Sequence, residues 1–342
     1  MKRSLVLLGV VILVAAGCGG SGGGTKPSAG TTTQGGKKFK VGLVPDVTGL
    51  NDRGFNHLSY VGLLRAQREV GVEPVVYHSN AQLDYLPNMT TLARKGYDLT
   101  IAVGYTESTA VDTAATNFPT SKFAIVDVDQ TTEPHKPTNL LGLLFREQET
   151  GYLVGYLAGL EEKRRPGPDM VGSVGGEKQP PVDRFIAGYQ AGAKAADPGI
   201  KVVNDYSQDF GDQAKCKQIA LNQIEQGAGA IFQVAGACGL GALDAAKEKH
   251  VWGIGVDADQ SFLGPHILTS AVKRVDTAVF LAIKSVVDGT FKGGNMVFGL
   301  KQNGVGLGKI SPKVPKSEVA AVDKVRAEII SGKIKNIPTV VK

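Results

Sequence analysis

The sequence predicts an α/β protein made of two copies of one doubly wound unit, and three observations support this prediction. First, Val126-Asp127-Val128-Asp129-Gln130 recurs as Val256-Asp257-Ala258-Asp259-Gln260, 130 positions later. Second, an apolar run precedes each copy, which is typical of a buried parallel strand that ends in carboxylates. Third, other matches share this spacing to within one residue: Val41 with Val171, Phe55 with Phe185, Gly62 with Gly192, and residues 96–103 with 227–234. Two facing units of this kind predict a cleft between acidic strand ends.

Length and composition agree with two globular lobes. The 342 residues can bury two full cores, and 42% hydrophobic with 20% charged residues is ordinary for a soluble domain. The net charge is +6, but lysines and arginines are dispersed and form no basic block or stripe with aromatic residues. We therefore expect no nucleic acid partner.

The N-terminus predicts export and lipid anchoring. A basic start is followed by an apolar stretch at 4–16, as in a secretion signal, and this stretch is shorter than the roughly 20 residues that span a bilayer. Ala15-Ala16-Gly17-Cys18 resembles a bacterial lipobox, with Ala15 where leucine is usual. We expect a lipoprotein signal peptide at 1–18, lipidation of Cys18 and a Gly/Ser/Thr/Lys-rich flexible tether at 19–38. This places the protein on the extracytoplasmic face of the cell membrane; an ordinary signal peptide with an incidental cysteine is the alternative.

The first unit alternates strands and helices. Apolar runs predict strands, and apolar residues at helical spacing predict helices, with Gly71 as the stop of the first helix. The strands are expected at 39–44, 75–77, 99–103 and 123–126, and the helices at 56–70, 85–95 and 107–117. This order demands a parallel sheet with helices on both faces.

The second unit repeats the same order, and later elements return to complete both lobes. Strands are expected at 170–174, 201–203, 230–234 and 252–256, helices at 182–196, 212–226 and 240–250, a hinge strand at 267–272, and two further helices at 275–288 and 317–330. We expect an N-terminal lobe formed by 39–147 with about 274–300. The C-terminal lobe is expected from 148–273 with about 301–342.

Two cysteines remain after Cys18. Cys216 falls on a predicted helix and Cys238 in the loop after the next strand, so a disulfide is possible, and such bonds persist outside the cytoplasm. Two isolated cysteines lack zinc-ligand spacing. No other motif predicts a metal or a cofactor.

The loop after the first strand carries the most specific motif. It runs from Asp46 to Asn56 and reads DVTGLNDRGFN. It resembles the signature loop of the basic membrane protein (BMP) family of substrate-binding lipoproteins, whose usual form is close to D-x-G-x-x-N-D-x-S-F-N. This chain has Gly54 in place of the serine and one extra residue before the glycine. The resemblance covers roughly 39 to 307 and continues through FRE at 145–147, GYQAG at 188–192, QVAG at 233–236, GVDADQ at 255–260 and TSAVK at 269–273.

The family includes purine-nucleoside-binding lipoproteins of bacterial ABC importers. The resemblance therefore implies a type I periplasmic-binding-protein (Venus flytrap) fold that closes on a nucleoside. It implies that Phe55 and Phe185 sandwich the base, with stacking worth roughly 1–3 kcal/mol per face. Alternatively, both rings are core residues at helix starts. Asp257 and Lys273 match positions that hold ribose hydroxyls; a helix cap and a surface lysine are the alternatives.

The remaining candidate residues would read the base or approach the ligand closely. Asp46, Asn51, Asn56 and Asp127 offer acceptors and amides for a purine edge. Asn51 and Asp52 could instead only shape the loop. Gly236 is expected in the pocket because a residue without a side chain lets the backbone come close to a ligand.

The leading hypothesis is therefore a lipid-anchored receptor that delivers a nucleoside to an ABC permease, with hinges near 146–150 and 269–273. The same fold could hold a flavin, a sugar or a signalling molecule, or serve as a surface receptor without import. We expect no enzyme, since HExxH, G-x-S-x-G and P-loop motifs are missing, although Asp127 and Asp257 could form a glycosidase pair. A sugar-repressor-like transcription factor would need a helix-turn-helix where this chain has its signal sequence.

Overall fold

The computed structural model describes residues 38–341, which belong to one compact unit. The predicted signal peptide, Cys18 and all but the last residue of the predicted tether lie outside the described residues. Among residues 38–341, none of the helices is both long and apolar enough to cross a membrane.

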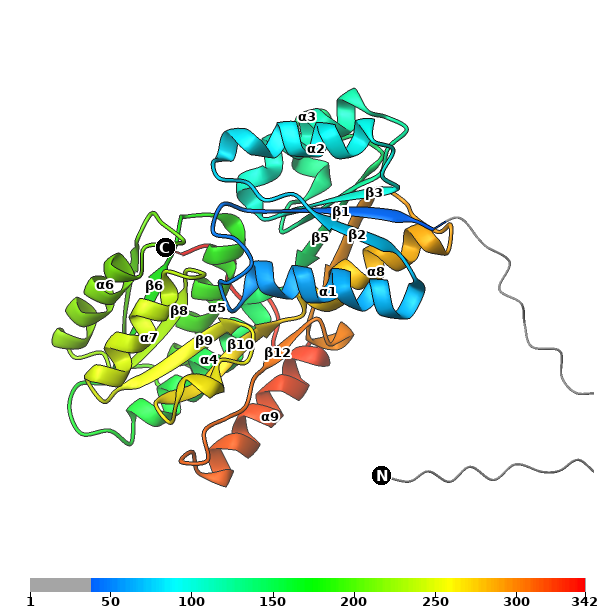
Figure 1. Ribbon diagram of the computed structural model, residues 1–342. Coiled ribbons are helices and arrows are strands. Elements are labelled where there is room, and N and C mark those ends of the chain that lie inside the picture. Colours follow the sequence, from blue (N-terminus) through cyan, green and yellow to red (C-terminus); the bar gives the residue numbers. More distant parts are fainter. Residues whose placement is uncertain (1–37, 342) are drawn as a thin grey trace, which may run out of the picture. The chain divides into compact units, whose positions relative to one another are not determined.

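The first lobe is built on a sheet whose paired strands run parallel. Its spatial order is β11 (Gly294–Phe298), β5 (Leu140–Phe145), β4 (Phe123–Val126), β3 (Leu99–Val103), β1 (Lys40–Pro45) and β2 (Glu73–Val76). Helices α2 (Tyr85–Arg94) and α3 (Ser108–Asn117) cover one face, and α1 (Phe55–Val70) and α8 (Val275–Val287) cover the other (Figure 1). The central strands are buried on both faces, which explains their continuous apolar sequences.

The second lobe repeats this design. Its spatial order is β12 (Val305–Leu307), β10 (Ile267–Lys273), β9 (Trp252–Asp257), β8 (Ala230–Val234), β6 (Met170–Gly175) and β7 (Lys201–Tyr206), with β12 antiparallel to β10. Helices α6 (Gln213–Glu225) and α7 (Gly239–Glu248) lie on one face, and α4 (Glu147–Glu162) and α5 (Pro180–Ala196) on the other; α9 (Lys316–Ile330) packs against α4 (Figure 1). The predicted doubly wound α/β units are therefore present twice.

The chain passes between the two sheets at three places. It leaves the first sheet after Phe145 and enters α4, returns after Lys273 into α8, and crosses again between β11 and β12. One hydrophobic core follows these crossings, since residues of α1 and α8 cluster with residues of α4 and α5. The two lobes therefore share one continuous hydrophobic core, to which α1, α8, α4 and α5 contribute.

The predicted strands and helices of both units form within a few residues of the expected bounds, but β5, α4, β11 and β12 were not predicted. Helix α4 lacks a one-sided apolar stripe because it is buried on most of its surface, including several acidic side chains. Its glycines Gly151, Gly155 and Gly159 also lower the intrinsic helix propensity. Burial between neighbouring elements therefore overrides the local signal.

These glycines let α4 and α5 pack backbone against backbone. A Cβ atom added to Gly155 would collide with the carbonyl oxygen of Tyr189, and one added to Gly192 would collide with that of Tyr152. Only residues without a side chain permit so close an approach. This contact fixes the distance between α4 and α5. The start of α5 carries residues of the cavity described below, and α4 begins with Glu147, which pairs with a lysine of that cavity.

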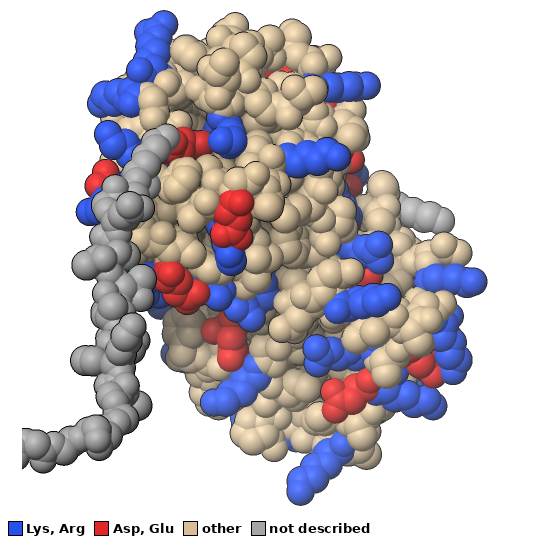
Figure 2. All heavy atoms as spheres, turned by 90° about the vertical axis from the view of Figure 1, so that its right-hand side faces the viewer, with Lys and Arg blue, Asp and Glu red and all other residues tan. Residues whose placement is uncertain are grey.

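The positive charge is spread over the surface. The face in Figure 2 has lysines and arginines on both its upper and lower parts, with acidic side chains among them. Several of the exposed cations pair with carboxylates, as Lys217 does with Asp244 at 2.5 Å and Lys284 with Asp288 at 2.5 Å. The net charge of +6 thus forms no single basic patch on this face.

Gly155→Ala should destabilise the protein by about 1–3 kcal/mol, because the added methyl group forces α4 and α5 apart. Urea unfolding followed by circular dichroism measures this loss. Gly306→Ala is the matched control, since no atom lies within 4 Å of a Cβ at that glycine. Equal midpoints for the two variants would contradict the close-packing argument.

Candidate functional site

A cavity lies at the carboxyl ends of both sheets and is lined by residues of both lobes. It contains about 610 Å³ of space when its opening to solvent is included. Asp46, Asp127, Val234 and Asp257 mark the ends of β1, β4, β8 and β9 at its wall. This is where doubly wound sheets bind their ligands.

Lys273 is the buried cation of the site. It is the last residue of β10 and is 1% exposed. Its Nζ lies 2.6 Å from each carboxylate oxygen of Asp127 and 3.1 Å from Oε1 of Glu147. Arg184 approaches the other Glu147 oxygen at 3.6 Å. Because Asp127 follows β4 of the first sheet, this ion cluster joins the two lobes.

The two strand-end aspartates share a backbone conformation that few residues adopt. Asp127 has φ of 72° and Asp257 has φ of 61°, both in the left-handed region. They occupy equivalent positions of the internal repeat. Such strained positions cost free energy and cluster at functional sites. The conformation turns both carboxylates into the cavity instead of continuing the strands.

Aromatic rings from both lobes line the same space. The Lys273 Nζ lies 5.1 Å from the ring centre of Phe55 and 5.6 Å from that of Phe185, distances at which cation–π attraction operates. Phe55 is partly exposed, whereas Phe185 is only 3% exposed and packs edge-on against Phe232 at 6.1 Å. Phe185 thus belongs both to the core and to the wall. Phe210 contributes a third, partly exposed ring.

The first loop is held by its own side chains. Oδ1 of Asp46 accepts hydrogen bonds from the amide and hydroxyl of Thr48 and from Nδ2 of Asn56, at 2.6–2.9 Å. Asp52, which is 2% exposed, accepts from the amides of Gly54, Asn56 and His57. The remaining oxygen of Asp46 lies on the side of Gly104. The loop therefore presents one oxygen of Asp46, while the other oxygen of Asp46 and the Asp52 carboxylate are engaged within the loop.

Most of the predicted ligand residues line the cavity, and two do not. Those that line it are Asp46, Phe55, Asp127, Phe185, Gly236, Asp257 and Lys273. Asn51 is exposed and lines a separate crevice together with Gln213, outside the lining of the cavity. Asn56 is fully buried behind Asp46: the helix turns about 100° per residue, so Phe55 faces the cavity and Asn56 faces the sheet.

Three important residues were not assigned from the sequence. Asp52 lines the cavity although it was considered only as a loop-shaping residue, which it also is. Glu147 lies in the matched FRE segment, but nothing in the sequence reveals its contact with Lys273. Phe210 follows β7 and has no partner in the repeat, so no pattern pointed to it.

Burial dominates the electrostatics of the cluster. It raises the pKa of Asp257 to about 7, with Lys273 opposing this shift and the neighbouring carboxylates reinforcing it. Burial also raises the pKa of Glu147, again against the attraction of Lys273. For Lys273, burial favours the neutral amine, but Asp127, Glu147 and Asp257 outweigh it and raise its pKa. The lysine therefore stays charged, while Asp257 changes charge near neutral pH.

Asp257→Asn should change how stability depends on pH. Because the pKa of Asp257 in the folded state is about 7 and its ordinary value is 3.8, the folded protein holds this proton more tightly than the unfolded chain. The bound proton on Asp257 stabilises the folded protein fully below pH 3.8, and this stabilisation is lost as the pH rises through about 7. The variant should therefore match the native protein near pH 4 and exceed it by at least about 1 kcal/mol at pH 8.

Urea unfolding of ligand-free protein across this pH range makes the measurement. Asp323→Asn, at an exposed carboxylate on α9, is the control and should follow the native curve. Parallel curves for Asp257→Asn and the native protein would show that this carboxyl does not titrate as proposed.

Comparison with known proteins assigns the family. A family model described as ABC transporter substrate-binding protein, PnrA-like, matches residues 39–338. An uncharacterised lipoprotein of Pyrococcus horikoshii is 38% identical over 319 residues, covering 89% of this chain and 76% of the relative. A protein of Lactococcus lactis named ABC transporter nucleoside-binding protein BmpA is 33% identical, covering 98% and 99%. Basic membrane protein A of Borreliella burgdorferi is 32% identical, covering 98% and 95%.

Solved structures confirm the predicted fold class. A solute-binding protein of an ABC transporter system from Aeropyrum pernix superposes with a TM-score of 0.80 at 28% identity, covering 88% of this chain and 94% of that one. A second such protein, from Conexibacter woesei, gives 0.69 at 25% identity, covering 89% and 100%. Both have the two-lobed periplasmic-binding-protein architecture found here. The chain thus belongs to the PnrA-like family of ABC transporter substrate-binding proteins, the family that its first loop resembles.

Proposed function

We propose that this substrate-binding protein captures a nucleoside, with purine nucleosides preferred, and delivers it to an ABC permease. The observation that carries the proposal is that aromatic side chains of both lobes line one cavity together with Lys273 and Asp257. A nucleoside needs both features, because its base is a flat π-system and its ribose carries vicinal hydroxyls. The relative from Lactococcus lactis is named for nucleoside binding, which supports the same ligand class.

The aromatic rings would hold the base. Phe55 reaches the cavity from the first lobe, and Phe185 and Phe210 reach it from the second. Stacking on such rings tolerates different bases and contributes roughly 1–3 kcal/mol per base. A base between the lobes would therefore draw them together.

The ribose would lie against the charged residues. The Asp257 carboxylate, once ionised, can accept hydrogen bonds from both vicinal hydroxyls, while Lys273 can donate to a ribose oxygen. Asp46, with one oxygen left free by its loop, and Asp127 then remain for N–H donors on the base edge. Asn51 and Asn56 take no part in this arrangement.

The location follows from the N-terminal motif. We propose that Cys18 carries the lipid anchor on the extracytoplasmic face of the membrane and that the following segment tethers the two lobes. Relatives named lipoproteins support this arrangement. The lobes, taken as 39–147 with 274–300 and 148–273 with 301–342, would close by bending at the crossings after Phe145 and Lys273.

The proposed role is binding without chemistry. This role agrees with the family, whose members are described as substrate-binding proteins of ABC transporters. A flavin, a sugar or another polyhydroxylated compound would also meet acceptors at the strand ends. These ligands are the alternatives that the first experiment must separate from nucleosides.

That experiment combines two measurements on freshly purified protein. Mass spectrometry of the small molecules released by denaturation identifies a retained ligand. Calorimetric titration with adenosine, guanosine, inosine, cytidine, uridine, riboflavin and ribose then ranks affinities, and a purine nucleoside at micromolar Kd or tighter is expected. Selective binding of riboflavin or ribose would refute the nucleoside proposal.

Phe55→Ala should weaken binding of the best nucleoside by about 1–3 kcal/mol, because one stacking face is lost. Isothermal titration calorimetry measures the change in Kd. Phe262→Ala is the matched control, since this ring is 61% exposed and lies outside the cavity lining. An unchanged Kd for Phe55→Ala would remove the ring from the binding site.

A further inference from the structure

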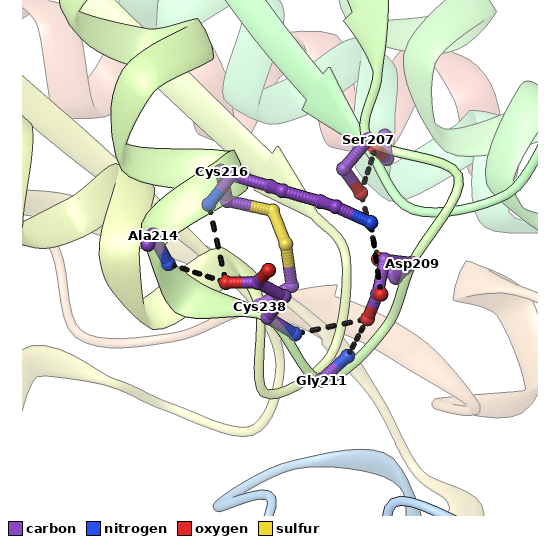
Figure 3. Close-up of polar contacts among 9 residues, drawn as sticks. Ser207, Asp209, Gly211, Ala214, Cys216 and Cys238 are labelled. Atoms are coloured by element: carbon purple, nitrogen blue, oxygen red, sulfur yellow. Dashed lines mark hydrogen bonds and ion pairs between the residues drawn. A yellow bond between two sulfur atoms is a disulfide. The ribbon is translucent and has the colours of Figure 1, made fainter.

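A disulfide joins the starting ends of two neighbouring helices in the second lobe (Figure 3). Cys216 lies in the first turn of α6, and Cys238 directly precedes α7. Their Cα atoms are 5.6 Å apart, and both side chains are fully buried among small apolar residues. The bond therefore fixes the distance between these two helix ends.

The loop at 207–212, which connects β7 with α6, is folded around one carboxylate. Oδ1 of Asp209 accepts hydrogen bonds from the amides of Gly211 and Asp212 at 2.7 and 2.9 Å, and Oδ2 pairs with Lys215 at 3.2 Å (Figure 3). The Ser207 hydroxyl donates to the Asp209 carbonyl at 2.7 Å. These bonds give the loop a defined shape, but they do not attach it to α7.

The loop is attached to the start of α7 by a backbone hydrogen bond of Cys238, whose position relative to α6 is fixed by the disulfide. The amide of Cys238 donates to the carbonyl of Phe210 at 2.8 Å, and the amide of Cys216 donates to the carbonyl of Asp212 at 3.5 Å. The backbone amide of each bonded cysteine thus contacts one point of the loop, and the disulfide fixes the distance between these two contacts. On the other side, Gln208 is tied to the carbonyl of Gly176 at 3.0 Å.

The anchored loop contributes the ring of Phe210 to the wall of the cavity. Its partly exposed ring lines the wall and lies so close to Gly176 that a Cβ there would collide with it. Gly236, with φ of 55°, lies next to Phe210 and also lines the cavity. The ring is thus placed by backbone contacts on two sides, and one of them depends on Cys238.

We infer that the Cys216–Cys238 disulfide is a positioning element of the ligand site that holds the Phe210 wall in place. The inference rests on the proposed function, because it requires a small-molecule ligand in this cavity. A disulfide that only restricts the unfolded chain would stabilise the protein without changing affinity. A positioning disulfide changes affinity in folded protein, since ordering the Phe210 loop would then have to accompany binding.

The test compares the full-length native chain with the double variant Cys216→Ser/Cys238→Ser. Calorimetry with adenosine, guanosine, inosine, cytidine and uridine is carried out well below the unfolding temperature. The double variant should bind the best nucleoside roughly 2- to 10-fold more weakly, the effect expected for one or two newly mobile side chains. Hydrogen exchange should rise at 207–212 while the strands of the first lobe stay unchanged.

Two further variants separate positioning from general destabilisation. Leu92→Ala removes a fully buried side chain from the first lobe and should cost stability comparable to loss of the disulfide, yet leave Kd unchanged. In a Phe210→Ala background, the cysteine substitutions should cause little further loss of affinity, because coupled residues are not additive.

Unchanged affinity together with unchanged exchange at 207–212 in the double variant would overturn the inference. So would an equal loss of affinity in Leu92→Ala, since stability alone would then explain the effect. If the native chain binds none of the five nucleosides, the proposed function fails separately. The exchange at 207–212 then decides alone whether the disulfide holds this wall.

Discussion

The structure depends on one buried ammonium group. Lys273 is almost inaccessible to solvent. An unpaired charge at this position would cost more free energy than the net stability of a typical folded protein. Its partners come from separate parts of the chain: Asp127 from the end of a first-lobe strand and Glu147 from the first turn of α4. Two of the three crossings between the lobes therefore end on the same ion cluster. Any movement of one lobe against the other must keep this charge compensated.

The internal repeat made the fold and much of the site predictable. It placed Asp127 and Asp257 at equivalent strand ends, and the alternating elements around them required parallel sheets. The same reasoning did not find β5, α4, β11 and β12, although β5 and β11 occupy the places in the first sheet that β10 and β12 occupy in the second. Their burial depends on contacts with residues far away in the chain.

The sequence did not reveal in which direction the individual side chains of the predicted site point. Asn51 and Asn56 stand in the right loop, yet one faces solvent and the other supports Asp46 from behind. Phe185 was expected either in the core or in the cavity, and it lies in both. Glu147 and Phe210 acquire their roles only through long-range contacts. Residue type and spacing thus locate a site, whereas the tertiary structure decides which atoms face it.

The threefold crossing also determines how this chain can be divided. The first sheet needs 40–145 together with 294–298, and the second needs 170–273 together with 305–307. Neither lobe is thus a continuous stretch of sequence, so a single cut anywhere between β1 and β12 separates strands of at least one sheet. A nascent chain emerging from the ribosome can complete neither lobe until almost all of it has been synthesised. Folding of either lobe is therefore an event of the nearly complete chain.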